Sequence, residues 1–273
     1  MALANLVTTK NKLIAGGLTW ALSFFSPTLS AAPYLLKSDI LSAQATGKID
    51  KSEINNKVQA KFEAQKIARK KAAESLRQQI ANLPITQEQT LAQLSSLNQT
   101  FATRVQGSLQ GAFVQSSSVQ TVNGGVTADV TLGVCLNNFV EQCVGKQDLS
   151  NALLPLLEPE SDIVERYKTE QYPQAIQRAF IFAVGQKNYS ATLQTKIYTE
   201  QGHLVLQSSD LAQQDKKAFV WRAKTADLSG YKPMIVEVRE VNGSDLIISE
   251  NAAAAILANL RQSEIDGLFV VQF

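Results

Sequence analysis

The chain has 273 residues, with 26 lysine and arginine residues against 24 aspartate and glutamate residues and a single histidine. Because 45% of the residues are hydrophobic and only 18% are charged, the composition is that of a folded protein rather than a disordered one. The near-neutral charge lacks the basic excess of nucleic-acid-binding proteins, so we expect no nucleic-acid partner.

The first 32 residues have the order of a secretory signal peptide. Lys10 and Lys12 precede an apolar run from Leu13 to Phe25, and small residues follow Pro27. The run is shorter than the roughly 20 residues that span a bilayer. We therefore predict export to the periplasm with cleavage after residue 30, 31 or 32; a buried first helix and a retained membrane anchor are the alternatives. The mature chain is then formally neutral, and we expect no transmembrane segment in it.

Residues 52–82, which follow a short predicted strand, indicate one long, alanine-rich helix. Apolar residues recur every four positions, first at Ile54, Val58 and Phe62 and then through alanines to Leu76 and Ile80. We expect this stripe to pack on a sheet, because small side chains let a helix approach closely.

Four basic residues cluster within that helix. They are Lys66, Arg69, Lys70 and Lys71. The cluster predicts either a solvated helix face or an interaction face that meets a partner, a phosphate group or a membrane surface.

A second helical stretch and a hairpin follow. Pro84 ends the long helix, and we expect a helix to restart at residues 86–89 and to bury Leu91, Leu94, Leu97, Phe101 and Val105. Residues 112–122 and 126–136 form the arms of a hairpin around Asn-Gly-Gly, which supplies the positive φ of a tight turn. These elements predict an N-terminal α+β domain over residues 33–147.

Cys135 and Cys143 are the two cysteines of the chain. A local, even pair in an exported protein predicts a disulfide, and two free thiols are the alternative. The spacing does not fit a CxxC redox or zinc motif.

Leucine, proline and glutamate residues over 148–159 predict a linker. A second α+β domain is expected over residues 160–273, with short strands and a helix that Ser249 caps. The fold class predicted for the whole chain is therefore α+β, with two small domains that each pack a mainly antiparallel sheet with helices.

Few residues offer catalytic chemistry. His203 is the one imidazole, lies in a strand-like pattern, and has no nucleophile elbow to serve. Glu158 and Glu160 could act as paired carboxylates, but their spacing is equally that of a charged linker. No phosphate loop, dinucleotide fingerprint or metal-ligand cluster is present, so we expect no cofactor, no metal and no enzymatic activity.

Three segments resemble a known group of envelope proteins. Residues 45–49 (ATGKI), 68–76 (ARKKAAESL) and 126–130 (VTADV) are similar to the Lpp-twenty-type lipoproteins and to the N-terminal domain of the flagellar H-ring protein FlgT. Second-half segments, such as 232–236 (KPMIV) and 244–249 (SDLIIS), look like the carboxy-terminal portions of such proteins. The resemblance implies a bacterial envelope protein without catalytic residues. The chain departs from the lipoproteins because no cysteine lies near the cut.

These observations predict an exported, non-enzymatic interaction or assembly factor of the cell envelope, for a flagellar or outer-membrane-associated complex. Its partner would be an envelope protein. The alternative function is a periplasmic small-ligand binder or hydrolase that uses a cleft between the two domains.

Overall fold

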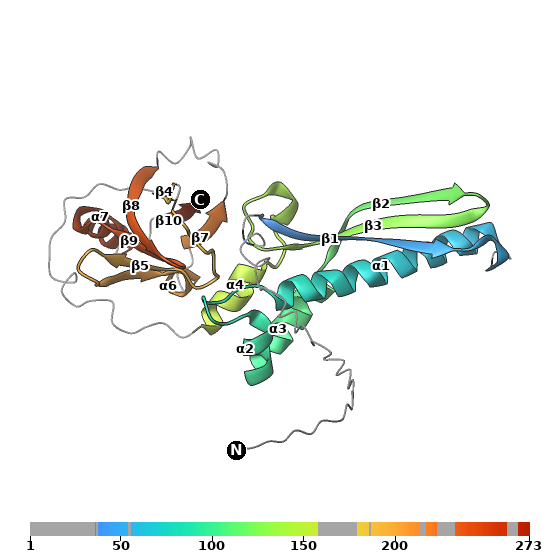
Figure 1. The fold of residues 1–273 in the computed structure, drawn as a ribbon, viewed down its shortest axis with the longest axis horizontal. Helices are drawn as coiled ribbons and strands as arrows, with labels where there is room; N and C mark the ends of the chain where they lie inside the picture. The colour runs from blue at the N-terminus through green and yellow to red at the C-terminus, as the bar shows by residue number, and fades with distance from the viewer. Residues whose placement is uncertain are drawn as a thin grey trace, which may run out of the picture.

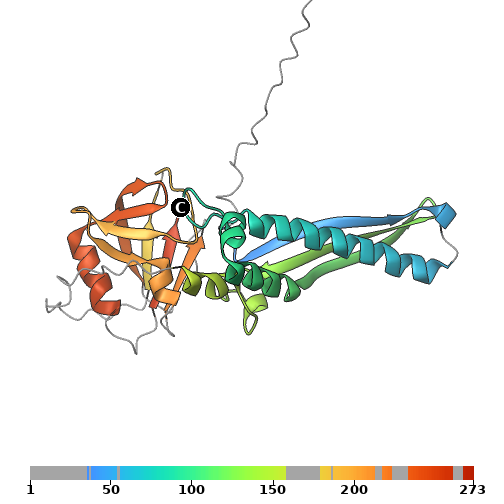
Figure 2. The same ribbon diagram turned by 90° about the horizontal axis from the view of Figure 1, so that it is seen from below.

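A computed structural model describes residues 36, 38–53, 56–157, 179–185, 187–212, 217–222, 233–260 and 267–273. The described residues form two parts, a narrow one built from the first half of the chain and a rounder one built from the second (Figures 1 and 2). The first half contains β1 (Ile40–Ile49), η2 (Lys51–Glu53), α1 (Lys57–Ala81), α2 (Leu91–Leu97), α3 (Gln99–Gln110), β2 (Phe113–Val122), β3 (Gly125–Cys135), η3 (Glu141–Cys143), α4 (Leu149–Leu153) and η4 (Leu154–Leu156). The second half contains β4 (Ala179–Ala183), β5 (Lys196–Thr199), β6 (Leu204–Gln207), α6 (Ser208–Ala212), β7 (Lys217–Arg222), β8 (Met234–Asn242), β9 (Asp245–Ile248), α7 (Glu250–Leu260) and β10 (Gly267–Gln272).

The narrow part is an antiparallel sheet in the order β1-β3-β2 with α1 along one face, and we call these four elements the paddle (Figure 2). The predicted hairpin is confirmed. Its two-residue turn has positive φ at both Asn123 (52°) and Gly124 (82°), as a type I′ turn requires. A bulge between Val114 and Ser116 interrupts the register near the start of β2.

The long helix is confirmed over α1, a span of about 37 Å at 1.5 Å per residue. The side chain of Asn56 caps it by accepting hydrogen bonds from the N–H groups of Val58 and Gln59. The buried stripe repeats every four residues and consists of Ala60, Ala64, Ala68, Ala72, Leu76 and Ile80.

The N-terminal end of the predicted stripe is wrong. Val58 and Phe62 are 62% and 66% exposed, and Ile54 lies outside the described residues. The reason is the close approach of α1 to the sheet: the main chain at Gly47 lies so near to Ala64 that only small residues fit beneath the helix. The alanines therefore take the buried positions, and the bulky neighbours face outward.

The expected helix restart at residues 86–89 is also wrong. The Thr86 hydroxyl accepts hydrogen bonds from the N–H groups of Glu88 and Gln89, which closes a tight turn. A helix begins only after Thr90, where the Thr90 N–H donates to the Gln93 side chain as in a capping box. Of the expected inward residues, Leu91 and Phe101 are buried, Leu94 and Val105 are partly buried, and Leu97 is 80% exposed.

The described part of the predicted 148–159 linker is helical. Asp148 accepts a hydrogen bond from the Asn151 N–H at 2.8 Å and so caps α4. Leu149, Leu153, Leu154 and Leu157 are buried in the main core cluster, so residues 149–157 are a packed segment rather than a spacer. Residues 158–178, which include Glu158 and Glu160, lie outside the described residues.

The α+β class is confirmed, but the sheet of the second half is not mainly antiparallel. Its described strands have the order β6-β5-β9-β8-β4-β10-β7, and four of the six pairings are parallel. The inner strands β4 and β10 bury alternate residues in two different core clusters, one on each face of the sheet. Burial on both faces is typical of parallel strands, which read as continuous apolar runs such as AFIFA and GLFVV.

The two halves are continuous through main-chain hydrogen bonds. The Leu193 N–H donates to the Pro84 carbonyl and the Gln194 N–H to the Ile85 carbonyl, both at 2.8 Å. The side chain of Gln87 also donates to the Asn242 carbonyl at 2.9 Å. One core cluster contains residues of both halves, so the paddle is anchored to the rounder part.

Candidate functional site

A groove with a volume of about 370 Å³ runs along the paddle between α1 and β2. Helix α1 packs mainly on β1 and β3, which leaves β2 beside the helix rather than beneath it (Figure 2). The lining residues are Phe62, Gln65, Lys66 and Arg69 of α1, Val114 and Ser117 of β2, and Val130 of β3. We call this the paddle groove.

The groove combines an apolar base with a cationic wall, which is formed by Lys66 and Arg69. Val130 is buried at its base, whereas Phe62 and Val114 are 66% and 45% exposed. The Gln65 side chain crosses toward the sheet and donates to the Ser117 hydroxyl at 3.3 Å. An exposed aromatic ring beside charged side chains is a common feature of protein-binding surfaces.

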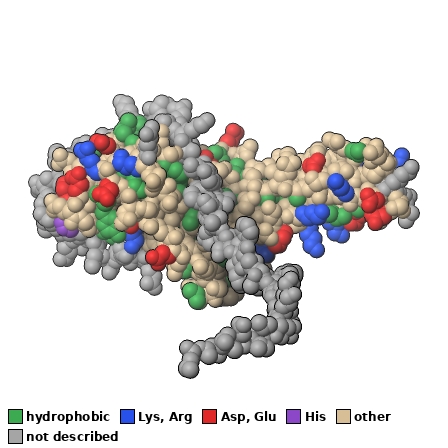
Figure 3. Space-filling view, in the orientation of Figure 1, with side chains coloured by type: hydrophobic (Ala, Val, Ile, Leu, Met, Phe, Trp, Pro, Cys, Tyr) green, Lys and Arg blue, Asp and Glu red, His purple; other side chains and the backbone are tan. Residues whose placement is uncertain are grey.

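Helix α1 is strongly basic although the chain is nearly neutral. It holds seven basic and two acidic side chains, and basic groups gather along it in Figure 3. The Lys66 ammonium lies 3.9 Å from the Glu63 carboxylate, but both side chains are largely exposed, so this ion pair is weak. Because little of this charge is neutralised within the described residues, the groove favours an anionic ligand.

The predicted interaction residues Lys66, Arg69, Lys70 and Lys71 are all exposed on α1, but they divide between two sides. Lys66 and Arg69 line the paddle groove. Lys71 reaches the opposite side, where its ammonium donates to the Thr46 carbonyl of β1 at 3.4 Å. The interaction face itself stays a prediction; of its four residues, Lys66 and Arg69 line the groove.

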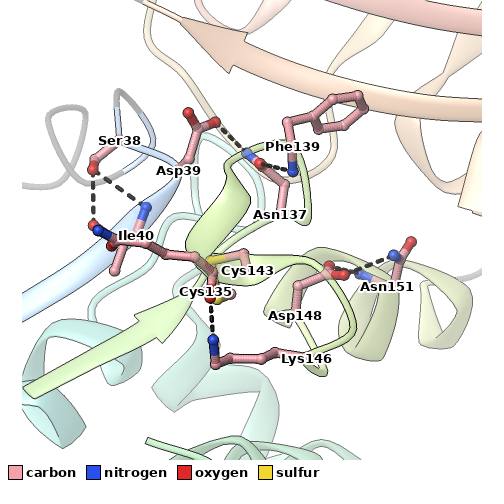
Figure 4. The surroundings of a disulfide bond; sticks show 11 residues. Ser38, Asp39, Ile40, Cys135, Asn137, Phe139, Cys143, Lys146, Asp148 and Asn151 are labelled. Carbon is pink, nitrogen blue, oxygen red and sulfur yellow. Dashed lines mark hydrogen bonds between the residues drawn. A yellow bond between two sulfur atoms is a disulfide. The ribbon is translucent and has the colours of Figure 1, made fainter. Parts of the chain in front are cut away.

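The predicted disulfide joins Cys135 and Cys143, whose Cα atoms are 5.8 Å apart (Figure 4). Both cysteines are buried, and the bond ties the end of β3 to η3. The next segment is fixed by Asn137, whose side chain donates to the Asp39 carboxylate at 2.8 Å (Figure 4). The disulfide therefore stabilises the base of the paddle, and neither sulfur is a free nucleophile.

His203 lies in the turn before β6 rather than within a strand. Its N–H donates to the Thr199 hydroxyl at 3.3 Å, and its carbonyl accepts from the Thr199 N–H at 2.8 Å. Its Nδ1 atom is buried and has no hydrogen-bond partner among the described residues. These main-chain bonds close the tight turn between Thr199 and His203.

A buried polar network in the second half was not predicted from the sequence. The Thr195 hydroxyl lies 2.8 Å from the Tyr189 hydroxyl and accepts a hydrogen bond from the Trp221 indole N–H at 3.2 Å. The Thr195 N–H donates to the Ser208 hydroxyl. Burial raises the pKa of Tyr189 far above its ordinary value, so the phenol stays neutral. The network fixes the loop that bonds to Pro84, which is a structural role.

Phe62, Val114 and Ser117 are groove residues that sequence reasoning missed. No sequence signal distinguishes Val114 or Ser117, and the outward position of Phe62 depends on the phase in which the alanine stripe packs on the sheet. Among the described residues no group of acidic, histidine or cysteine side chains is arranged to hold a metal ion. No described helix is long and apolar enough to span a membrane.

In comparisons with known proteins, no protein-family model matches the chain, and no curated protein sequence matches it. The resemblance to the Lpp-twenty-type lipoproteins and to FlgT therefore stays a prediction that rests on its short segments.

Proposed function

We propose that this chain is an exported, non-enzymatic envelope protein that acts as an interaction or assembly factor and binds a protein partner in the paddle groove. The partner belongs to the periplasm or to an outer-membrane-associated complex. The sequence resemblance to FlgT favours a flagellar complex of this kind.

The observation that carries this proposal is the exposed Phe62 ring beside Lys66 and Arg69. An aromatic side chain two-thirds exposed on a helix is costly to leave in water, and aromatic and arginine side chains dominate binding energy at protein interfaces. The groove offers both kinds of side chain, because Phe62 and Arg69 line it together.

Export is supported by the disulfide and by the order of residues in the N-terminal segment. A bond between two buried cysteines persists in an oxidising compartment and is uncommon in the cytosol. The periplasm is such a compartment.

Photo-cross-linking in living cells tests the proposal. A benzophenone amino acid replaces Gln65 in the groove, and in a matched strain it replaces Gln78, an exposed residue of the same helix. We expect a discrete adduct with one envelope protein from position 65 and none from position 78. Equal adducts from both positions, or no adduct from position 65, would contradict the proposal.

Two charge-reversed variants with the same net charge sharpen this test. Lys66→Glu with Arg69→Glu changes the groove, whereas Lys70→Glu with Lys71→Glu changes the same helix outside the groove lining. We expect the first pair to abolish the adduct at position 65 and the second pair to retain it. Equal loss in both variants would indicate a diffuse electrostatic attraction instead of a groove.

A further inference from the structure

The two edges of the paddle sheet differ in how their main-chain groups are used. Val122 and Gly125 flank the two-residue turn and exchange both of their main-chain hydrogen bonds. Antiparallel pairs alternate, so Ser117, Val119 and Thr121 fall at pairs that do not bond to each other. Their N–H and C=O groups therefore point away from β3, toward the outer edge of β2.

The outer edge of β1 is partly occupied. By the same alternation, Ile40, Ser42, Gln44, Thr46 and Lys48 direct their main-chain groups outward. The Ser38 hydroxyl bonds to both the N–H and the carbonyl of Ile40. Two side chains of α1 bond to two further outward carbonyls: Gln79 donates to that of Ser42 at 3.2 Å, and Lys71 donates to that of Thr46 at 3.4 Å.

The outer edge of β2 has no such protection. No hydrogen bond from the described residues reaches the outward main-chain groups of Ser117, Val119 and Thr121. The strand FVQSSSVQTV is ten residues long and contains no charged residue and no proline. Proteins normally protect a long edge with lysine, proline, a bulge or a covering element, because an open edge pairs with other chains. The bulge of β2 lies before Ser117, and the stretch from Ser117 to Thr121 is open. The edge of β1 is instead bonded at Ile40, Ser42 and Thr46 and carries Lys48.

We propose that the outer edge of β2 receives an extended segment of a protein partner as a fourth strand, with acidic side chains directed at Lys66 and Arg69. This inference rests on the proposed function and identifies the partner's binding element. Main-chain hydrogen bonds to Ser117, Val119 and Thr121 supply affinity, and alternate side chains in the groove supply specificity.

The sheet register determines which side chains of the new strand enter the groove. Ser117 and Val119 pair with Val130 and Ala128, which are buried beneath α1, so their side chains lie on the α1 side of the sheet. Residues of an added strand directly opposite them lie on that same side, because paired residues share a face. Those positions meet the cationic wall and the Phe62 ring, and acidic and apolar side chains are complementary to them.

Charge argues against a second copy of this chain as the occupant. Two β2 strands paired antiparallel are related by a two-fold axis perpendicular to the sheet, which places both α1 helices on one face. Lys66 and Arg69 of each copy would then line a shared groove, where like charges repel. An acidic strand from another protein reverses the sign of that interaction.

Selection of displayed random ten-residue peptides on the complete exported protein tests the inference. We expect the enriched peptides to alternate, with glutamate or aspartate at every second or fourth position, and to bind in fluorescence anisotropy titrations. Replacing their acidic residues by amides should weaken binding about tenfold, and added salt should weaken it further. No enrichment, or enrichment of peptides without alternating acidic residues, would overturn the inference.

Edge variants locate the peptide. Ser117→Pro removes an outward N–H without removing a bond to β3, so the variant should keep its melting temperature and lose binding at least about tenfold. Ser117→Ala loses the same hydroxyl but retains the N–H, so it is the reference for the proline variant and should bind at least about tenfold more tightly than Ser117→Pro. Ser117→Glu provides a second edge variant if the proline variant unfolds, because its carboxylate repels the acidic residue opposite it, and Gln120→Glu, on the other face of β2, is its control with the same net charge. Equal peptide binding by Ser117→Pro, Ser117→Glu and the wild type would overturn the inference.

Two further outcomes would assign a different binding partner in place of the added strand. Binding to phosphatidylglycerol vesicles that Ser117→Pro leaves unchanged, without peptide enrichment, would assign the basic helix to a membrane surface. A dimer in light scattering that Ser117→Pro dissociates would assign the edge to a second copy. If the position-65 adduct forms and survives Ser117→Pro, the strand addition fails while the proposed function stands.

Discussion

Replacing Gly47 by alanine should test the close approach of α1 to the sheet. A Cβ atom at this position would lie 2.0 Å from the Ala64 carbonyl oxygen and 2.7 Å from the Ala68 nitrogen. Carbon atoms in ordinary van der Waals contact are about 3.5–4.0 Å apart. The obstacle is helix main chain, so no side-chain rotation relieves it, and α1 must move away by more than about 1 Å.

The expected loss in unfolding free energy is about 3 kcal/mol or more, at the upper end of the range for overpacked cores. For a protein of this size that loss corresponds to a fall of about 6–12 °C in melting temperature. Helix α1 would separate from its alanine contacts along β1 and β3, so the loss is not confined to one side chain.

Gly107→Ala is the matched control. Gly107 lies in α3, and no atom outside the adjacent backbone of that helix comes within 4 Å of the position of its Cβ. Alanine there should raise the unfolding free energy by about 0.5–1 kcal/mol, because glycine is the poorer helix former. Urea denaturation followed by circular dichroism at 222 nm measures both variants. A loss below about 1 kcal/mol for Gly47→Ala would refute the packing argument.

Replacing both Cys135 and Cys143 by alanine should lower the unfolding free energy by about 2.5 kcal/mol, which is the value expected for a disulfide that closes so short a loop. Urea titrations measure this loss, and an unchanged midpoint would show that the disulfide does not stabilise the fold. Burial raises the pKa of Asp148, so the folded state binds a proton more readily, and the contribution of this carboxyl to stability falls as the pH rises through that raised pKa. Asp148→Asn keeps an acceptor for the Asn151 N–H and removes the buried charge. The urea midpoints of this variant at pH 4 and pH 7 should therefore differ less than those of the wild type. A wider difference would contradict burial as the cause of the raised pKa. Leu76→Asp should cost about 4 kcal/mol or more by placing a charge in the core, and an exported variant with the wild-type melting temperature would show that Leu76 is not buried.

Local patterns in the first half predicted its elements well. The Asn-Gly turn with alternating arms fixed the hairpin, and the four-residue repeat of small residues predicted α1 and its buried stripe. The local pattern does not predict that Val58 and Phe62 are exposed, because their exposure depends on Gly47, which contacts the helix only in the folded state. Periodicity identifies an amphipathic helix, but tertiary contact decides the phase of its ends.

The second half shows where local reasoning ends. β4 pairs with β8 and β10, which lie far along the chain, and no short segment records such a pairing. The continuous apolar runs of β4 and β10 are typical of parallel strands buried on both faces, which is the sequence sign that contradicts a mainly antiparallel sheet. The leucine, proline and glutamate residues of 148–159 likewise predict a linker, whereas α4 packs into the core.

The candidate site was half predicted. Lys66 and Arg69 were singled out from charge alone, but the groove beside them required the position of β2 relative to α1. The open edge of β2 is a property of hydrogen-bond alternation and of side chains that protect β1 instead, such as Lys71 and Gln79. Neither property is visible before the sheet order is known.

Amide hydrogen exchange of the complete protein, with and without the partner captured at position 65, tests the central claim most directly. The account predicts that the outward amides of Ser117, Val119 and Thr121 exchange much more slowly in the complex, while the amides of β1 are unchanged. Binding that leaves the exchange of β2 unaltered, or that protects only strands of the second half, would contradict it.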